Sequence, residues 1–160
     1  MTHHTSPAVP AAAAPATGQT TSQTATQARV EDLTQASAFE RLGGEAGTRA
    51  LVDRFYDLMD LEPAYARLRE VHGSTLDDAR DKLFWFLCGW LGGPNHYIER
   101  FGHPRLRARH LPFSIGSVER DQWLACMFQA MDERQVEPAL RERLEKSLFD
   151  TADWMRNRAD

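Results

Sequence analysis

The segment FGHPRLRARHLPF, residues 101–113, combines histidines with closely spaced arginines between two stretches that have apolar residues at helical spacing. A neutral imidazole can form an axial bond to iron, and an arginine can bind a carboxylate through two parallel N–H groups. Apolar helices on either side would cover the faces of a flat ring system. The segment therefore suits an anionic, planar iron cofactor held within a helical protein.

Apolar residues recur at helical spacing outward from this segment in both directions. The predicted boundaries are a capping box at Ser37–Glu40, breaks at Gly43, Gly44 and Gly47, a helix through Leu51–Met59, a helix start at Ser74–Asp77, a stop at Gly92–Pro94 followed by a loop, a short helix from Pro104 to His110 ended by Pro112, an N-cap at Ser117 and a last helix from Pro138. No alternating strand pattern occurs in the sequence. We therefore predict an all-α domain, for which an ordinary helical bundle is the general alternative.

Composition limits the organisation of the chain and its partners. The 160 residues suffice for one domain, and a net charge of −4 with no block of Lys or Arg excludes an electrostatic surface for nucleic acid. No apolar run approaches the roughly 20 residues that span a bilayer, so we expect a soluble protein that does not enter membranes. Cys88 and Cys126 lack a metal-binding or disulfide-rich spacing, which favours buried thiols in a reducing cytoplasm over a bridge between them.

The N-terminal segment differs in composition from the rest of the chain. Residues 1–28 contain no acidic, basic (Lys or Arg) or aromatic residue and consist mainly of Ala, Thr, Pro, Gln and Ser. Such a segment buries too little apolar surface to offset the entropy lost on ordering. We predict a disordered tail over residues 1–36 and one folded domain over residues 37–160.

Several short patterns occur together in an order that resembles the truncated haemoglobins, specifically group II, which has a tryptophan in the distal pocket. These patterns are Phe55-Tyr56, Trp90-Leu-Gly-Gly-Pro94, the Gly102-His-Pro-x-Leu-Arg-x-Arg-His110 run and Trp123. The resemblance covers about residues 39–154. It implies a truncated globin fold, in which two antiparallel helix pairs form a two-on-two sandwich around haem b.

Four histidines lie beyond the tail: His72, His96, His103 and His110. The family motif assigns the proximal iron ligand to His110. One nitrogen of its imidazole would bind iron while the other donates a hydrogen bond to a backbone carbonyl and fixes the ring. We expect His96 in an exposed loop, and His103 either to hold the loop or to approach a haem propionate.

On the distal face, the resemblance places Tyr56 and Trp123 beside the bound ligand. The phenol and the indole are hydrogen-bond donors, which suits a ligand that gains negative charge. Ala79 would leave space for ligand entry, and Leu83 would pack beside the ligand. His72 would be a third polar group at the distal corner, or an ordinary loop histidine outside the pocket.

Further residues are candidates for contacts with the macrocycle and its propionates. Tyr97, Arg107 and Arg109 are candidates for the propionates, with a solvated basic turn as the alternative interpretation of the two arginines. Packing against the ring is predicted for Leu83, Phe86, Phe113 and Met127.

The leading functional interpretation is reversible binding of oxygen or another diatomic ligand at a five-coordinate haem, including a role in oxygen transport. We assign no catalytic residue. The alternatives are a haem enzyme with peroxidase-like or nitric oxide dioxygenase activity, which needs an unidentified reductase, a gas or redox sensor, and a haem-free helical interaction protein. The protein is expected to be a monomer or a homodimer.

Overall fold

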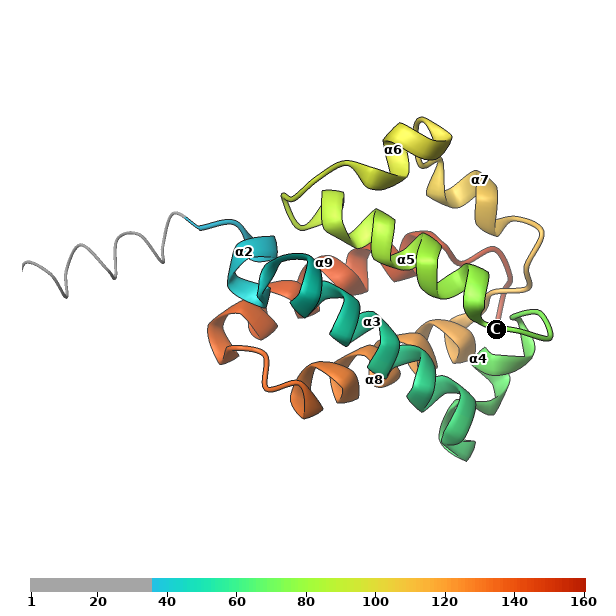
Figure 1. The fold of residues 1–160 in the computed structure, drawn as a ribbon. Coiled ribbons are helices and arrows are strands. Elements are labelled where there is room, and N and C mark those ends of the chain that lie inside the picture. The colour runs from blue at the N-terminus through green and yellow to red at the C-terminus, as the bar shows by residue number, and fades with distance from the viewer. Residues whose placement is uncertain (1–35) are drawn as a thin grey trace, which may run out of the picture. The chain divides into compact units, whose positions relative to one another are not determined.

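The computed structural model describes residues 36–160, and this range consists of helices and connecting loops without a β-strand (Figure 1). In chain order the elements are α2 (Ala38–Leu42), α3 (Gly44–Leu61), the single-turn 3₁₀ helix η1 (Pro63–Tyr65), α4 (Ala66–Glu70), α5 (Asp77–Trp90), α6 (His96–Phe101), α7 (Leu106–His110), α8 (Ser117–Glu133) and α9 (Pro138–Trp154). The predicted all-α domain is confirmed. The predicted tail lies, except for its last residue, outside the described residues.

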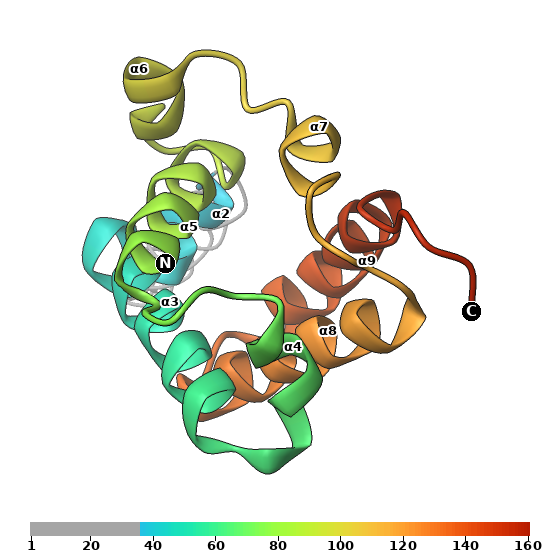
Figure 2. The same ribbon diagram turned by 90° about the vertical axis from the view of Figure 1, so that its right-hand side faces the viewer.

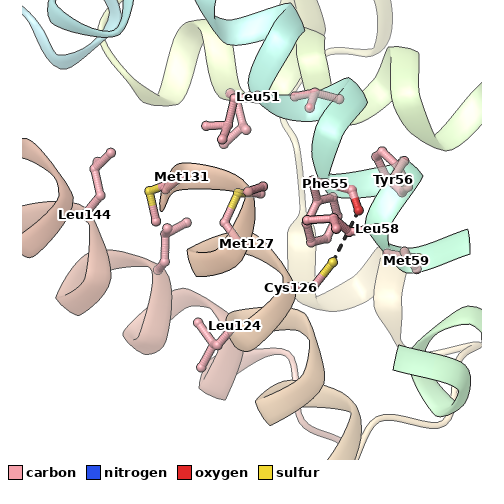
Figure 3. Close-up of a cluster of buried hydrophobic side chains, with 14 of the residues drawn as sticks. Leu51, Phe55, Tyr56, Leu58, Met59, Leu124, Cys126, Met127, Met131 and Leu144 are labelled. Carbon is pink, nitrogen blue, oxygen red and sulfur yellow. Dashed lines mark hydrogen bonds between the residues drawn. The ribbon is translucent and has the colours of Figure 1, made fainter. Parts of the chain in front are cut away.

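The long helices form two antiparallel pairs, α3 with α5 and α8 with α9 (Figure 1). The pairs meet where α3 packs on α8, and this contact holds the main core, with Phe55, Met127 and Met131 fully buried (Figure 3). The opposite ends of the pairs diverge, and α7 lies across the opening between α5 and α9 (Figure 2). This is the two-on-two arrangement that the resemblance implied.

The first two helices are joined by a sharp turn that depends on glycine. The Ser37 hydroxyl accepts a hydrogen bond from the Glu40 amide at 3.2 Å, which is one of the two hydrogen bonds of the capping box predicted at the start of α2. A Cβ atom on Gly47 would lie 2.0 Å from the carbonyl oxygen of Leu42. The absence of a side chain at Gly47 therefore lets the end of α2 approach the first turn of α3.

The starts of α5 and α8 differ in how well they match the sequence, and the predicted N-cap at Ser117 is wrong. Helix α5 begins at Asp77 as expected, but Leu76 occupies the N-cap, and no side chain caps it. Helix α8 has Gly116 as its N-cap, and the Glu119 carboxylate accepts a hydrogen bond from the Gly116 amide at 3.0 Å. Ser117 is instead the first helical residue, and its hydroxyl bonds to Asp160 near the C-terminus.

The prediction of a loop after Pro94 is wrong, because the six-residue helix α6 begins at His96. Its stability comes from packing. The rings of Tyr97 and Phe101 lie 4.9 Å apart, and Phe101 also packs at 6.0 Å from Trp85 of α5. A helix this short is marginal without tertiary contacts and carries too few apolar positions to show helical spacing.

Both cysteines are free and buried, so the prediction of thiols is confirmed. The Cys126 thiol donates to the carbonyl oxygen of Phe55 at 3.2 Å and so links α8 to α3 (Figure 3). Burial raises the pKa of Cys126 to about 12, which keeps it a protonated thiol.

Among the described residues, none of the helices has the length and apolar character needed to cross a membrane.

Candidate haem site

His110, the last residue of α7, is half-buried and its ring orientation is fixed. Its Nδ1 lies 2.6 Å from the carbonyl oxygen of Leu106. Because a carbonyl only accepts hydrogen bonds, Nδ1 must carry the proton, and Nε2 is left with a free lone pair. Within residues 36–160, Nε2 makes no hydrogen bond. This tautomer and this orientation are those that an axial imidazole ligand requires.

An open pocket of about 630 Å³ is lined by residues of α5, α7 and α9 and of the loop before α7, and His110 is not among its lining residues. Its volume is within the range typical of small-molecule and cofactor sites. Its apolar lining includes Phe86 and Trp90 of α5, Leu106 of α7 and Met155 after α9. A flat apolar cofactor would fit against these walls, and the predicted contact residue Phe86 is one of them.

The predicted distal residues do not line this pocket, and three of them, Tyr56 on α3, His72 after α4 and Trp123 on α8, form an aromatic cluster around Phe55. The Phe55 ring lies between two of them, with centroid distances of 4.9 Å to Tyr56 and 5.3 Å to Trp123. The ring of Tyr56 in turn lies 6.0 Å from the ring of His72. The fold therefore brings together three residues that the sequence separates by up to 67 positions (123 − 56).

Burial determines the protonation state of Tyr56. It raises the pKa of the phenol well above its usual value, and the Arg80 guanidinium, 5.8 Å from the ring, opposes this shift only in part. The hydroxyl therefore stays protonated across the physiological range. Neither this hydroxyl nor the indole N–H of Trp123 has a hydrogen-bond partner in the described part of the chain, so both donors are available to a ligand.

His72 sits just beyond α4 and is also held in one tautomer. Its Nδ1 donates to the carbonyl oxygen of Leu68 at 2.9 Å, which leaves Nε2 as an acceptor in the neutral ring. Burial lowers the pKa of His72, the hydrogen bond to Leu68 opposes this shift in part, and the positive charge of Arg69 lowers the pKa further. The ring of His72 lies beside that of Tyr56, and its place in a distal pocket stays a prediction.

The remaining predicted pocket residues lie on α5 and α8. Ala79, Leu83, Phe86 and Trp123 are half-buried and pack against the core, whereas Met127 is fully buried where α8 meets α3 (Figure 3). Met127 is thus part of the central core in this structure. Phe113, predicted to pack on the ring, is 47% exposed in the turn after α7.

The three propionate candidates differ in their contacts. Arg107 donates to the carbonyl oxygens of Trp154 and Arg156 and so joins α7 to the C-terminal end of α9. Among residues 36–160, Arg109 makes a hydrogen bond only through Nε, which donates to Pro104 at 2.8 Å, and its guanidinium lies 5.5 Å from the ring of buried Tyr97. Arg109 and Tyr97 therefore form a pair with free polar atoms, whereas Arg107 is engaged.

The other two histidines have local contacts. His103 Nδ1 accepts a hydrogen bond from the Arg105 amide at 3.1 Å, so His103 holds the loop before α7, as one of its two expected roles required. His96 is not in an exposed loop. It begins α6, is half-buried against Phe84, and lies 2.6 Å from a Glu45 oxygen.

Two residues near the distal cluster were not assigned by sequence reasoning. Phe55 separates Tyr56 from Trp123, and its only sequence signal was its place beside Tyr56 in the family pattern. Arg80 of α5 donates to Asp57 at 2.6 Å and to the backbone of Asp53 at 3.1 Å, so it ties α5 to α3 beside Tyr56. No local pattern marked Arg80, because its partners lie more than 20 residues away.

The helical arrangement and the histidine on α7 define a two-on-two globin. The sequence pattern of the bacterial-like globin family matches residues 37–157, and the chain belongs to this family. It is 41% identical to the group 2 truncated hemoglobin YjbI of Bacillus subtilis over 122 residues, which are 76% of this chain and 89% of that protein.

Solved structures agree with this assignment. The group II two-on-two hemoglobin of Agrobacterium tumefaciens superposes with a TM-score of 0.76 at 43% identity, covering 78% of this chain and 97% of that one. A truncated oxygen-avid haemoglobin from Bacillus subtilis gives a TM-score of 0.70 at 41% identity over 76% of this chain and all of that one. As a member of the globin family, the chain is a haem-binding protein. The free Nε2 of His110 fits that cofactor, and the apolar pocket is lined by its α7 neighbours Leu106 and Ala108.

Proposed function

We propose that this globin reversibly binds oxygen or another small diatomic ligand at haem b held by His110. The observation that carries the proposal is the Nδ1 hydrogen bond to Leu106, which leaves Nε2 of His110 free as an axial ligand. When bound, ferrous haem supplies the reversible bond to the gas. The description of the Bacillus subtilis relative as oxygen-avid supports oxygen as the ligand.

The distal residues stabilise and shield the ligand. Tyr56 and Trp123 each donate a hydrogen bond to a ligand that has gained electron density, and each bond contributes about 0.5 to 1.5 kcal/mol. Ala79 leaves room for entry because its methyl group is small. Leu83, one turn further along α5, restricts the access of water.

The rim of the site anchors the carboxylates of the cofactor. We assign this role to Arg109 together with Tyr97, because the guanidinium lies beside the phenol ring and retains free N–H groups. Phe86 packs on the macrocycle from the pocket wall. The two free, buried thiols fit a reducing cytoplasm, which we propose as the compartment.

The decisive experiment is the replacement His110→Ala, with His103→Ala as the matched control. After reconstitution with haem, the wild type is expected to show a five-coordinate ferrous spectrum with an iron–imidazole vibration. His110→Ala should lose haem or this vibration, and His103→Ala should keep both. An unchanged vibration in His110→Ala would reject the assignment, and equal losses in both variants would indicate a general defect of the loop.

A further inference from the structure

The six residues that follow α9 return across the loop between α7 and α8; we call residues 155–160 the C-terminal strap. The backbone of the strap pairs with this loop, because the Asn157 and Arg158 amides donate to the carbonyl oxygen of Ile115 at 2.9 and 3.2 Å. At its end, the Asp160 carboxylate accepts from the Ser117 amide at 3.1 Å. The strap is thereby fixed to the segment that follows the proximal histidine.

The Asn157 side chain makes hydrogen bonds with both of its polar atoms. Its Nδ2 donates to the carbonyl oxygens of His110 at 3.1 Å and Phe113 at 2.7 Å, and its Oδ1 accepts from the Ile115 amide at 3.0 Å. An amide group has two N–H donors and one carbonyl oxygen, so all of these groups are used. One side chain thus connects three backbone groups of the loop that leaves His110.

These contacts matter because α7 is short. It has five residues, and a helix of this length is not stable by itself. The carbonyl groups of its last turn also need partners from outside the helix. The carbonyl oxygen of His110 accepts two hydrogen bonds, one from the Phe113 amide at 3.0 Å and one from the Asn157 side chain. The backbone position of His110 therefore depends on the strap.

The start of α7 is joined to the same region. Arg107 donates to the carbonyl oxygen of Arg156 at 3.1 Å and also to that of Trp154. The strap and the end of α9 consequently hold α7 on both sides of the imidazole. A small rotation of α7 would change the direction of Nε2, because the ring is tied to Leu106 one turn earlier in the same helix.

We propose that Asn157 is a positioning residue for the proximal ligand, which sets the direction and strength of the iron–imidazole bond through the backbone of His110. This inference rests on the proposed function of His110. It assigns a role in the haem site to a residue that is 47 positions away and does not contact the imidazole ring.

The test is Asn157→Asp, which keeps the size of the side chain and its acceptor but replaces the donor by an oxygen that faces two carbonyls. In the full-length ferrous protein the iron–imidazole stretching frequency should shift downward. Transfer of haem to excess apomyoglobin should accelerate about two- to tenfold, the range expected from losing the one hydrogen bond that Asn157 donates to the carbonyl of His110 itself. In the haem-free protein, hydrogen exchange should increase in a peptide covering residues 108–116.

Asn157→Ala removes the same donors without introducing a charge, and it should cause the same changes. Asp160→Asn is the matched control: it alters the strap where it meets α8 and should leave the vibration and the transfer rate unchanged. The proposal fails if Asn157→Asp and Asn157→Ala only lower the thermal stability while the vibration and the transfer rate stay at wild-type values. It also fails if only the aspartate variant shows an effect, because repulsion alone would then explain it.

The wild-type protein distinguishes this failure from failure of the proposed function. If the reconstituted wild type shows no iron–imidazole vibration, the role of His110 is wrong and no positioning residue is needed. If the wild type shows the vibration and the Asn157 variants do not alter it, only the role of Asn157 is wrong.

Discussion

At the residue scale, the distal site depends on which groups can donate a hydrogen bond at neutral pH. The raised pKa keeps the Tyr56 hydroxyl protonated, and the Trp123 indole always carries its proton. His72 differs, because its neutral ring uses its single N–H on Leu68 and presents only a lone pair at Nε2. In the proposed distal site, Tyr56 and Trp123 can therefore donate at neutral pH, and the Nε2 of His72 can donate only after the ring is protonated.

The first prediction concerns the distal donors. Trp123→Phe keeps most of the aromatic volume beside Phe55 but removes the indole donor. Oxygen dissociation, measured by stopped flow, should accelerate about two- to tenfold. Tyr56→Phe removes one oxygen atom and should act in the same direction, and the double variant shows whether the two donors are coupled. Dissociation rates equal to those of the wild type in both single variants and the double variant would contradict the assignment.

The second prediction concerns the pH dependence of stability. Burial lowers the pKa of His72 in the folded protein below its unfolded value of about 6.5. Between these two pKa values the unfolded chain binds more protons than the folded protein. The contribution of His72 to the free energy of unfolding is therefore fully present above about pH 6.5 and is lost as the pH falls below that value. Urea unfolding of wild type and His72→Phe at a series of pH values should show a smaller acid loss in the variant.

The exposed His103 provides the control for this pH series. His103→Phe should keep the acid dependence of the wild type, because His103 is not buried. An acid loss that is identical in wild type and His72→Phe would show that the burial of His72 does not contribute to it.

At the scale of the elements, close backbone approaches decide where helices meet. Gly47 permits the junction of α2 and α3, and the amide of Phe39 donates to the carbonyl oxygen of Leu91 at 2.9 Å, which attaches α2 to the end of α5. The α2 segment thus closes one end of the α3–α5 pair. Its geometry depends on backbone atoms, which tolerate little displacement.

The third prediction tests this junction with Gly47→Ala. In a helix, alanine is favoured over glycine by roughly 0.5–1 kcal/mol. The new Cβ would lie 2.0 Å from the Leu42 oxygen, and relieving such an overlap costs about 1–3 kcal/mol. The overlap is the larger effect, so urea unfolding should show a net loss of stability.

Gly73→Ala is the matched control for the junction, since no atom lies within 4 Å of a Cβ at that position. Its stability should stay close to that of the wild type. A Gly47→Ala variant as stable as the wild type would mean that α2 moves away from α3 without cost.

At the scale of the whole molecule, the family pattern begins at residue 37, where the composition of the chain also changes. The core is formed by α3, α5, α8 and α9 within residues 36–160. We propose residues 37–160 as the globin domain and residues 1–36 as a dispensable tail.

The fourth prediction is that deletion of residues 1–36 preserves the globin. The shortened protein should match the full-length protein in its melting temperature with haem bound and in its iron–imidazole vibration. The comparison requires equal haem occupancy, because a bound cofactor raises the melting temperature by mass action. A lower melting temperature at equal occupancy would show that the tail contributes to the fold.

Local patterns in the sequence were sufficient to predict the all-α class and most of the helices, and the family pattern was sufficient to predict the two-on-two globin. These features depend on residues close in sequence or on a family pattern of fixed spacing. The roles that this pattern implies for His110, Tyr56 and Trp123 stay predictions. Helix α6, the separation of Tyr56 from Trp123 by Phe55 and the roles of Arg80 and Asn157 could be found only in the tertiary structure. Each of them rests on contacts between distant segments, and no local pattern determines which distant groups a short helix or a polar side chain will meet.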